Sequence, residues 1–227
     1  EHGVKLGPEH VIMTCGAAGA LNVILKTILD PGDEVVTPVP FFVEYRTYVD
    51  NHNGVTKLVK TKSDFALDLW AIEEAVTERT KAILINSPNN PSGAVYSEDF
   101  VRQVVLLCER KDIWLVMDDT YNRLVFDGRQ PTNAYAYTNE DVDASKLVIV
   151  NSVSKMYAMT GFRVGWAVGN RDLVKAMTNI QSQQTSGPAT PSQWAAVGAL
   201  NGVQNSVEAL RLTLQNNRDV LMARLQA

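Results

Sequence analysis

Three short apolar segments, residues 82–86, 113–117 and 147–150, constrain the fold of this 227-residue chain more than any other feature. Apolar runs of this length without alternating polar residues are typical of strands buried on both faces of a sheet. Segments with helical periodicity separate them, and strands that alternate with helices indicate an α/β fold. The chain is therefore expected to form a mostly parallel sheet covered by helices.

Other elements of the expected fold have weaker patterns. Further strands are predicted at residues 11–14, 34–37, 55–59 and 164–168, and helices at 69–78 and 171–181. The helix expected after Gly19 carries five apolar residues on one face: Leu21, Ile24, Leu25, Ile28 and Leu29. Ser97, followed by the acidic Glu98 and Asp99, is a typical start for another helix.

Polar residues follow each of the three buried strands. The sequences after them are Ser87-Pro88-Asn89-Asn90-Pro91-Ser92-Gly93, Asp118-Asp119-Thr120-Tyr121, and Asn151-Ser152-Val153-Ser154-Lys155. Open parallel sheets bind ligands at the carboxyl ends of their strands. An amide, a carboxylate with a phenol, and an amine flanked by serines are therefore expected at one edge of the sheet.

A turn of small residues, Gly16 to Gly19, leads from the first predicted strand into a helix. The free N–H groups and the dipole of a helix start form an anion site. Arg163 lies eight residues after Lys155 and could join this site. Taken singly, each motif also has a structural interpretation: a tight turn, a cap for Asp118, or a solvent-exposed Lys155.

Together these groups favour one kind of cofactor. An anion cradle, a carboxylate, a phenol and a lysine suit pyridoxal phosphate, whose aldehyde forms a Schiff base with a lysine and whose ring nitrogen pairs with a carboxylate. A dinucleotide site requires G-x-G-x-x-G, but the chain has only Gly16-Ala17-Ala18-Gly19. A Walker-type phosphate loop is also missing from the sequence.

The composition of the chain argues against several other classes of protein. The 21 Lys and Arg against 25 Asp and Glu leave a net charge of −4, which argues against a nucleic-acid partner. No apolar run approaches the roughly 20 residues that cross a bilayer, and no signal-peptide pattern is present. Two cysteines exclude a disulfide scaffold, and the three histidines form no HExxH pair, so no metal site is predicted. A cytoplasmic protein is expected.

The motifs resemble those of a known family. Ser152-Val153-Ser154-Lys155, followed by Thr160-Gly161-Phe162-Arg163-Val164-Gly165, resembles the Schiff-base lysine signature of class I/II aminotransferases, pyridoxal-phosphate enzymes of the aspartate aminotransferase fold. Ser87 to Gly93 resembles their Asn-Pro-[Thr/Ser]-Gly segment, and Asp118 to Tyr121 their Asp-Glu-x-Tyr segment, with Asp119 in place of Glu. The resemblance implies the large cofactor-binding domain, a three-layer α/β/α fold around a mixed sheet of about seven strands.

The resemblance also implies a role for each matching position. Lys155 matches the Schiff-base lysine, Asp118 the carboxylate at the pyridine nitrogen, and Tyr121 with Asn90 the groups that hydrogen-bond the ring's phenolic oxygen. Phe42 matches the aromatic residue that stacks on the ring, where the family more often has Trp or Tyr. The positions that match the phosphate cradle are Gly16, Ala17, Ala18, Ser152, Ser154 and Arg163. Lys155, Asp118 and Tyr121 are the predicted catalytic residues.

The activity implied is transamination between an L-amino acid and a 2-oxo acid by a homodimer, with Lys155 as the Schiff-base residue. Two alternatives stay open: a C–S β-lyase on the same scaffold, and the aminotransferase-like domain of a regulator that senses the cofactor behind a DNA-binding module. The sequence Met159-Thr160-Gly161-Phe162-Arg163 is more typical of an aminotransferase.

The domain organisation is predicted as a cofactor-binding domain over residues 1–190 and a helical extension over 191–227. The chain starts at Glu1 and stops within a helical pattern, so a piece of a longer protein is expected, with weak activity by itself. The resemblance implies a preceding segment and a following small domain that carries the substrate-carboxylate arginine. Arg211, Arg218 and Arg224 are expected to lie on a solvent-exposed face of the last helix.

Overall fold

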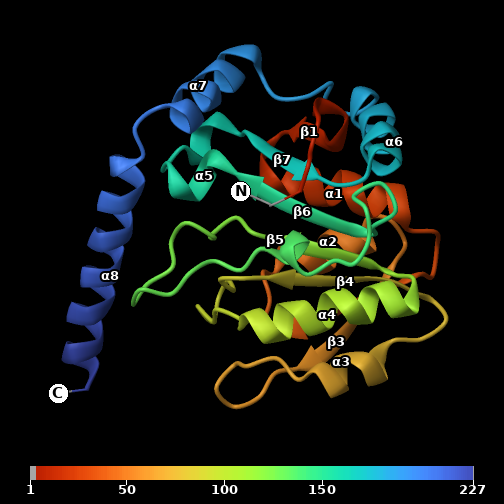
Figure 1. Ribbon diagram of the computed structural model, residues 1–227, viewed down its shortest axis with the longest axis horizontal. Coiled ribbons are helices and arrows are strands. Elements are labelled where there is room, and N and C mark those ends of the chain that lie inside the picture. The colour runs from red at the N-terminus through yellow and green to blue at the C-terminus, as the bar shows by residue number, and fades with distance from the viewer. Residues whose placement is uncertain (1–3, 227) are drawn as a thin grey trace.

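A seven-stranded mixed sheet forms the centre of the computed structural model, which describes residues 4–226 (Figure 1). The strands are β1 (Val11–Thr14), β2 (Glu34–Val39), β3 (Val55–Lys60), β4 (Thr80–Asn86), β5 (Trp114–Asp118), β6 (Leu147–Ser152) and β7 (Gly165–Val168). Their order is β1-β7-β6-β5-β4-β2-β3, and only β7 runs antiparallel to its neighbours. The predicted α/β fold with a mostly parallel sheet is confirmed.

Helices cover both faces of this sheet. The helices of the described residues, whether or not they cover the sheet, are α1 (Gly16–Ile28), α2 (Glu44–Asp50), α3 (Leu69–Ala75), α4 (Glu98–Lys111), α5 (Val153–Met156), α6 (Arg171–Ser182), α7 (Thr190–Asn201) and α8 (Asn205–Leu225). Short 3-10 turns add Pro8–His10, Ala134–Ala136 and Thr160–Phe162. One layer contains α1, α2 and α6, and the other contains α3 and α4 (Figure 1).

Alternation along the buried strands separates two apolar cores. In β5, Leu115 and Met117 pack with α4, whereas Val116 packs with α1 and α2. Successive side chains of a strand point to opposite faces, so Asp118 at the end of β5 faces the α1 and α2 layer. The strand period therefore decides which helices surround the polar edge.

The prediction of a helix over 69–78 was partly wrong, because α3 ends at Ala75. The next residues form a turn in which the Thr77 N–H donates to Thr80 Oγ1 at 2.8 Å. The Thr77 hydroxyl donates to the buried Glu34 carboxylate at 2.6 Å. These side-chain bonds replace the last turn of the predicted helix, since threonine hydroxyls compete with the helical backbone for hydrogen bonds.

Helix α4 begins as predicted after Ser97, whose Oγ accepts a hydrogen bond from the Phe100 N–H at 3.2 Å. Ser97→Ala should lower the free energy of unfolding by about 1 kcal/mol, because it leaves a helix-start N–H without its partner. Urea denaturation measures this change. Ser63→Ala, at an exposed turn position, is the control and should unfold at the wild-type midpoint. Equal midpoints for both variants would contradict the capping role.

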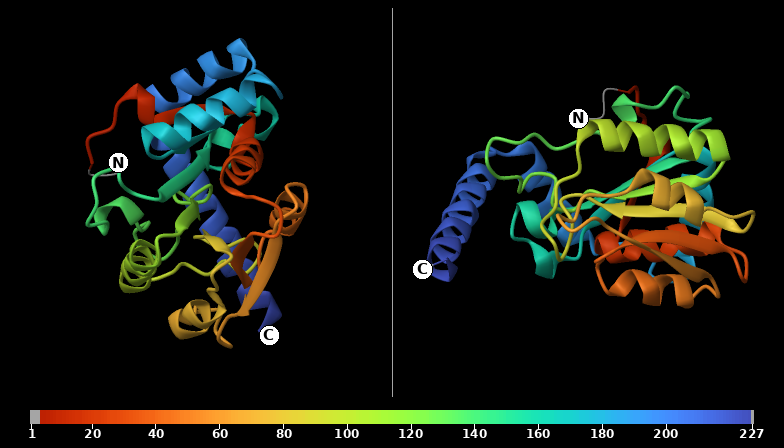
Figure 2. Two further views of the ribbon diagram at one scale, coloured as in Figure 1. Left: turned by 90° about the vertical axis from the view of Figure 1, so that its right-hand side faces the viewer. Right: turned by 90° about the horizontal axis from the view of Figure 1, so that it is seen from below.

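Helix α8 projects away from the body of the molecule (Figure 2). The expectation that its arginines are merely solvent-exposed was wrong for two of them. Arg218 forms a two-bond ion pair with Asp127, at 2.6 and 2.7 Å, and its guanidinium lies 5.1 Å from the Phe126 ring centroid. Arg211 pairs with Glu208 and donates to the Val125 carbonyl. These contacts tie α8 to the loop after β5. Within residues 4–226, no helix is both long and apolar enough to span a membrane.

Candidate active site

The polar strand ends meet at one cavity of about 220 Å³, formed by the carboxyl ends of β4, β5 and β6 and by the start of α1. This is far larger than the 10–15 Å³ that a water molecule needs. Ten of the eleven predicted site residues line it: Ala17, Ala18, Phe42, Asn90, Asp118, Tyr121, Ser152, Ser154, Lys155 and Arg163. Gly16 lies directly behind, against the Arg163 guanidinium. The predicted convergence at the sheet edge therefore exists in the fold.

Asp118 is the buried carboxylate of this cavity. Its Oδ1 accepts hydrogen bonds from the N–H of Thr120 at 3.1 Å and from the Thr120 hydroxyl, and its Oδ2 accepts from the Tyr45 hydroxyl at 2.6 Å. Burial raises the pKa of Asp118, while these donors and the charge of Lys155 oppose that rise. Hydrogen bonds to the charged form favour it, so the site holds a desolvated carboxylate with donors on both oxygens.

Lys155 lies in α5, a single helical turn that follows β6 directly. Ser152 begins this turn, because its Oγ accepts a hydrogen bond from the Ser154 N–H at 3.3 Å. The half-buried Lys155 amine lies 5.7 Å from the centroid of the Tyr121 ring. Sequence patterns did not predict α5, which is too short for helical periodicity to reveal.

The loop after β4 is tied to the end of β5. Asn86 Nδ2 donates to the Asp118 carbonyl at 2.8 Å, and Asn86 Oδ1 accepts from the Asn90 N–H at 2.7 Å. The Asn90 amide then reaches the Tyr121 hydroxyl at 3.4 Å. One asparagine at the strand end thus places a second one beside the phenol, and an oxygen atom in the cavity could contact both groups.

The start of α1, where the sequence predicts an anion cradle, has free backbone N–H groups. Gly16 has φ +75°, a conformation that favours glycine, and no side chain caps the helix within this fully described segment. A Cβ on Gly16 would lie 2.7 Å from Arg163 Nη2. A Cβ on Gly165 would lie 2.5 Å from the Gly16 carbonyl carbon and 2.6 Å from the Ala17 nitrogen. The two glycines therefore allow α1, β7 and a guanidinium to meet, next to Ala17 and Ala18 at the cavity wall.

Phe42 lines the cavity and packs edge-on against Tyr45, with ring centroids 5.6 Å apart and planes at 80°. An aromatic ring at the wall of a cavity can stack on a planar ligand. Asp119, by contrast, is not among the residues that line the cavity. Burial and the neighbouring Asp118 raise the pKa of Asp119 well above its ordinary value.

Sequence reasoning missed several residues around the cavity: Leu21, Glu44, Tyr45, Asn86, Thr120 and Thr160. Asn86 and Thr120 flank the strand ends that had been identified, so their position offered a signal. The sequence position of Tyr45 offered no such signal, because Tyr45 belongs to α2, a short helix that was not predicted. Its apolar residues contact the core through tertiary packing.

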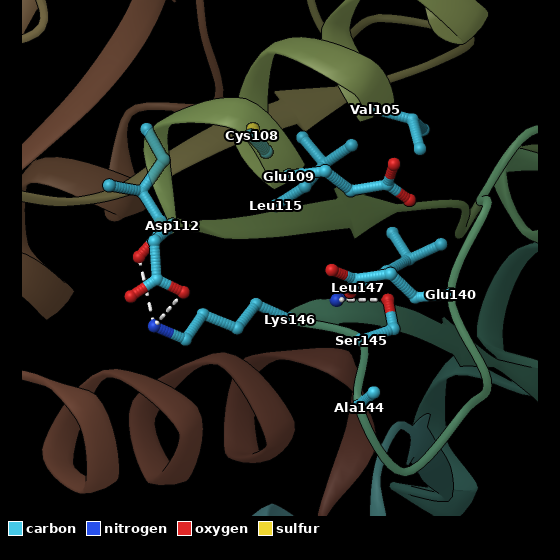
Figure 3. A pocket seen from close by; sticks show the side chains of 11 residues that line it. Val105, Cys108, Glu109, Asp112, Leu115, Glu140, Ala144, Ser145, Lys146 and Leu147 are labelled. Atoms are coloured by element: carbon cyan, nitrogen blue, oxygen red, sulfur yellow. Dashed lines mark hydrogen bonds and ion pairs between the residues drawn. The ribbon is translucent and has the colours of Figure 1, made fainter.

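A second pocket lies at the opposite, amino end of β5 and β6 (Figure 3). It measures about 20 Å³, which is room for about one water molecule. Lys146 Nζ there binds the Asp112 carboxylate at 2.6 Å and the Asp112 carbonyl at 2.9 Å. Lys146 and Asp112 thus pair with each other there, and the 220 Å³ cavity that the predicted site residues line is the candidate active site.

Comparison with known proteins agrees with this geometry. Residues 1–227 match the family model "Aminotransferase class I and II". The chain belongs to this family. It is 36% identical over its whole length to aspartate aminotransferase of Bacillus sp. (strain YM-2), and 37% to aspartate/prephenate aminotransferase of Thermus thermophilus. It covers 58% and 59% of those proteins, so it spans little more than half the length of such relatives.

Solved structures of aminotransferases share the fold. The Thermus thermophilus aspartate aminotransferase structure with maleate superposes with a TM-score of 0.92 at 36% identity, over 99% of this chain and 59% of that one. The Rhizobium meliloti aspartate aminotransferase gives 0.92 at 37% identity, over 97% and 55%. Members of the family depend on pyridoxal phosphate. The amine, buried carboxylate, phenol and uncapped helix start of the cavity fit that group.

Proposed function

We propose that this chain is the cofactor-binding part of an aminotransferase that moves an amino group between an L-amino acid and a 2-oxo acid. The observation that carries the proposal is the convergence of Lys155, Asp118 and the uncapped start of α1 on one cavity. Family membership supports the same reaction. A lysine alone would be an ordinary surface group, but a half-buried amine beside a buried carboxylate and a helix-start anion site is not.

Lys155 is the residue proposed to do the chemistry. Its Nζ would hold the cofactor's aldehyde carbon and, once displaced by a substrate amine, would carry the proton from the substrate Cα. Pyridoxal phosphate, when bound, supplies an electron sink for the charge left on that carbon. Tyr121 lies beside the amine and is positioned to orient it.

The remaining residues bind and orient. Asp118 would keep a positive charge on the ring nitrogen, and Asn90 with Tyr121 would donate to the ring oxygen. The N–H groups of Gly16, Ala17 and Ala18, the hydroxyls of Ser152 and Ser154, and Arg163 would hold the phosphate. Phe42, at the cavity wall, would stack on the face of the cofactor ring. Burial of Asp118 strengthens its attraction for a cationic ring.

The proposed organisation places the cofactor domain in residues 1–190 and a helical extension toward a further domain in 191–227. Exposed apolar side chains on both late helices support contacts with other parts of the protein or with a second copy. They include Trp194 and Val197 on α7, and Leu221, Met222 and Leu225 on α8. We propose a cytoplasmic homodimer, and analytical ultracentrifugation of the full-length protein checks its state. A monomer at micromolar concentration would contradict the dimer.

The activity is tested with the full-length protein, pyridoxal phosphate and a panel of amino donors. The expected result is turnover that depends on an added 2-oxo acid and that produces the oxo acid of the donor. Release of pyruvate and a thiol without an acceptor would indicate a C–S β-lyase instead. Cofactor binding with neither reaction, together with DNA binding, would favour the regulatory alternative.

A further inference from the structure

A tyrosine that belongs to none of the sequence motifs contacts the Asp118 carboxylate. Tyr45 lies in α2, and its hydroxyl donates to Asp118 Oδ2 over 2.6 Å, across 73 residues of sequence. Tyr45 is 1% exposed and Asp118 is 6% exposed. A hydrogen bond to a charged oxygen at this depth is among the stronger ones that a protein makes.

The two carboxylate oxygens of Asp118 are held differently. Oδ1 accepts from the N–H and the hydroxyl of Thr120, whereas Oδ2 accepts from Tyr45. Thr120 is two residues away and moves with the same loop, so Tyr45 is the donor that comes from a different layer of the fold. An ionised carboxylate accepts about four hydrogen bonds. One acceptor direction therefore remains, and Asp118 is at the cavity wall.

The phenol of Tyr45 is itself immobilised. Its ring stacks on Phe41, with centroids 6.4 Å apart, and meets Phe42 edge-on at 5.6 Å. The rest of the ring packs in the core between α1 and the sheet. An aromatic ring held on two sides can direct its hydroxyl to a fixed point, because only the C–O torsion remains free.

Other tyrosines show that burial of a phenol does not require a carboxylate partner. Tyr135 is equally buried, and its hydroxyl donates to the backbone carbonyls of Leu147 and Val168. Tyr48, one turn further along α2, donates to the Glu44 carboxylate. Tyr45 differs from these two because its hydroxyl donates to Asp118, the buried carboxylate of the cavity, so its hydrogen bond affects the charge of that carboxylate, which a bond to a backbone carbonyl would not do.

We infer that Tyr45 is a positioning residue of the site: its hydroxyl orients the Asp118 carboxylate and favours its charged form, with one acceptor direction left for the ring nitrogen of the cofactor. This inference rests on the proposed function. Tyr45 acts through Asp118 and needs no contact with the reacting atoms. The family motif includes Asp118, whereas Tyr45 lies outside every motif and reaches Asp118 only through the tertiary fold.

The pH dependence of cofactor binding follows from the groups that face Asp118: Tyr45, Tyr48, Asp119, Tyr121 and Lys155. Burial raises the pKa of Asp118, and the Tyr45 hydroxyl is one of the donors that lower it. Binding that requires a charged Asp118 weakens as the pH falls through that pKa. Loss of the Tyr45 donor raises the pKa further, so binding should be lost at a higher pH.

Tyr45→Phe in the full-length protein tests the inference, with pyridoxal phosphate as the probe and quenching of tryptophan fluorescence as the readout of its Kd. We expect a Kd about tenfold or more above wild type near neutral pH. The acid limb of binding should move to higher pH by about one unit. The cofactor's own groups titrate alike in both proteins, so the difference between the two curves reports Asp118.

Tyr135→Phe is the matched control, since it removes an equally buried phenol whose hydroxyl donates to backbone carbonyls and not to Asp118, and it should keep the wild-type curve. Equal shifts in both variants, or a wild-type curve for Tyr45→Phe, would overturn the inference. If Tyr45→Phe does not fold, Thr120→Val removes the other hydroxyl donor and should move the acid limb the same way; no movement there also overturns it. A wild-type protein that binds no cofactor would instead refute the proposed function.

Discussion

Lys155→Ala is expected to abolish transamination and leave the fold unchanged. The side chain is half-buried at the cavity wall, so truncation to alanine removes the amine without opening a core cavity. Loss of general acid–base transfer alone costs about 10² to 10⁴ in rate, and loss of the covalent link adds to it. Oxo-acid formation by the full-length variant should therefore fall below detection.

The covalent link can be measured apart from turnover. Borohydride reduction of the wild-type protein with bound pyridoxal phosphate should fix the cofactor on the peptide that contains Lys155, as read by mass spectrometry. Lys155→Ala should show no such adduct at the site, while its circular dichroism matches wild type. Lys175→Ala, at an exposed position on α6, is the control and should keep both adduct and activity. An adduct on a different lysine in active wild-type protein would refute the role of Lys155.

Gly165→Ala is expected to disrupt the phosphate cradle although residue 165 carries no functional group. The added methyl group would lie 2.5 Å from the Gly16 carbonyl carbon and 2.6 Å from the Ala17 nitrogen. Both contacts are with backbone, so α1 must move away from β7. Overpacking of this kind costs about 1–3 kcal/mol of stability. The cofactor Kd should rise by about tenfold to a hundredfold, since each lost hydrogen bond to a charged phosphate costs about 1.5–3 kcal/mol.

Gly161→Ala is the matched control for that substitution. Gly161 lies four residues earlier in the same segment, its backbone is not left-handed, and a Cβ there would meet nothing within 4 Å. Its cofactor Kd and unfolding midpoint should equal those of wild type. Cofactor titration and urea denaturation of the two variants decide the matter. Wild-type affinity in Gly165→Ala would mean that the start of α1 does not hold the phosphate.

The strands of this fold were largely predictable, whereas two of the short helices, α2 and α5, were not. Each of the buried strands β4, β5 and β6 was identified within two residues of its observed bounds, because burial on both faces leaves an uninterrupted apolar run. Helices α2 and α5 have seven and four residues. These two segments are stabilised by tertiary contacts rather than by their own propensity, and neither has a helical period in the sequence that indicates it.

The sequence by itself determined which chemical groups this chain brings to the edge of its sheet, because a strand's carboxyl end and the residues after it are neighbours along the chain. Lys155, Asp118, Asn90 and the start of α1 could be located in that way. Only the tertiary structure decided that Tyr45 reaches Asp118 and that Gly165 lies against Gly16. Those contacts join residues that are distant in sequence. They depend on how strands align and how a helix packs across a sheet, which local patterns do not specify.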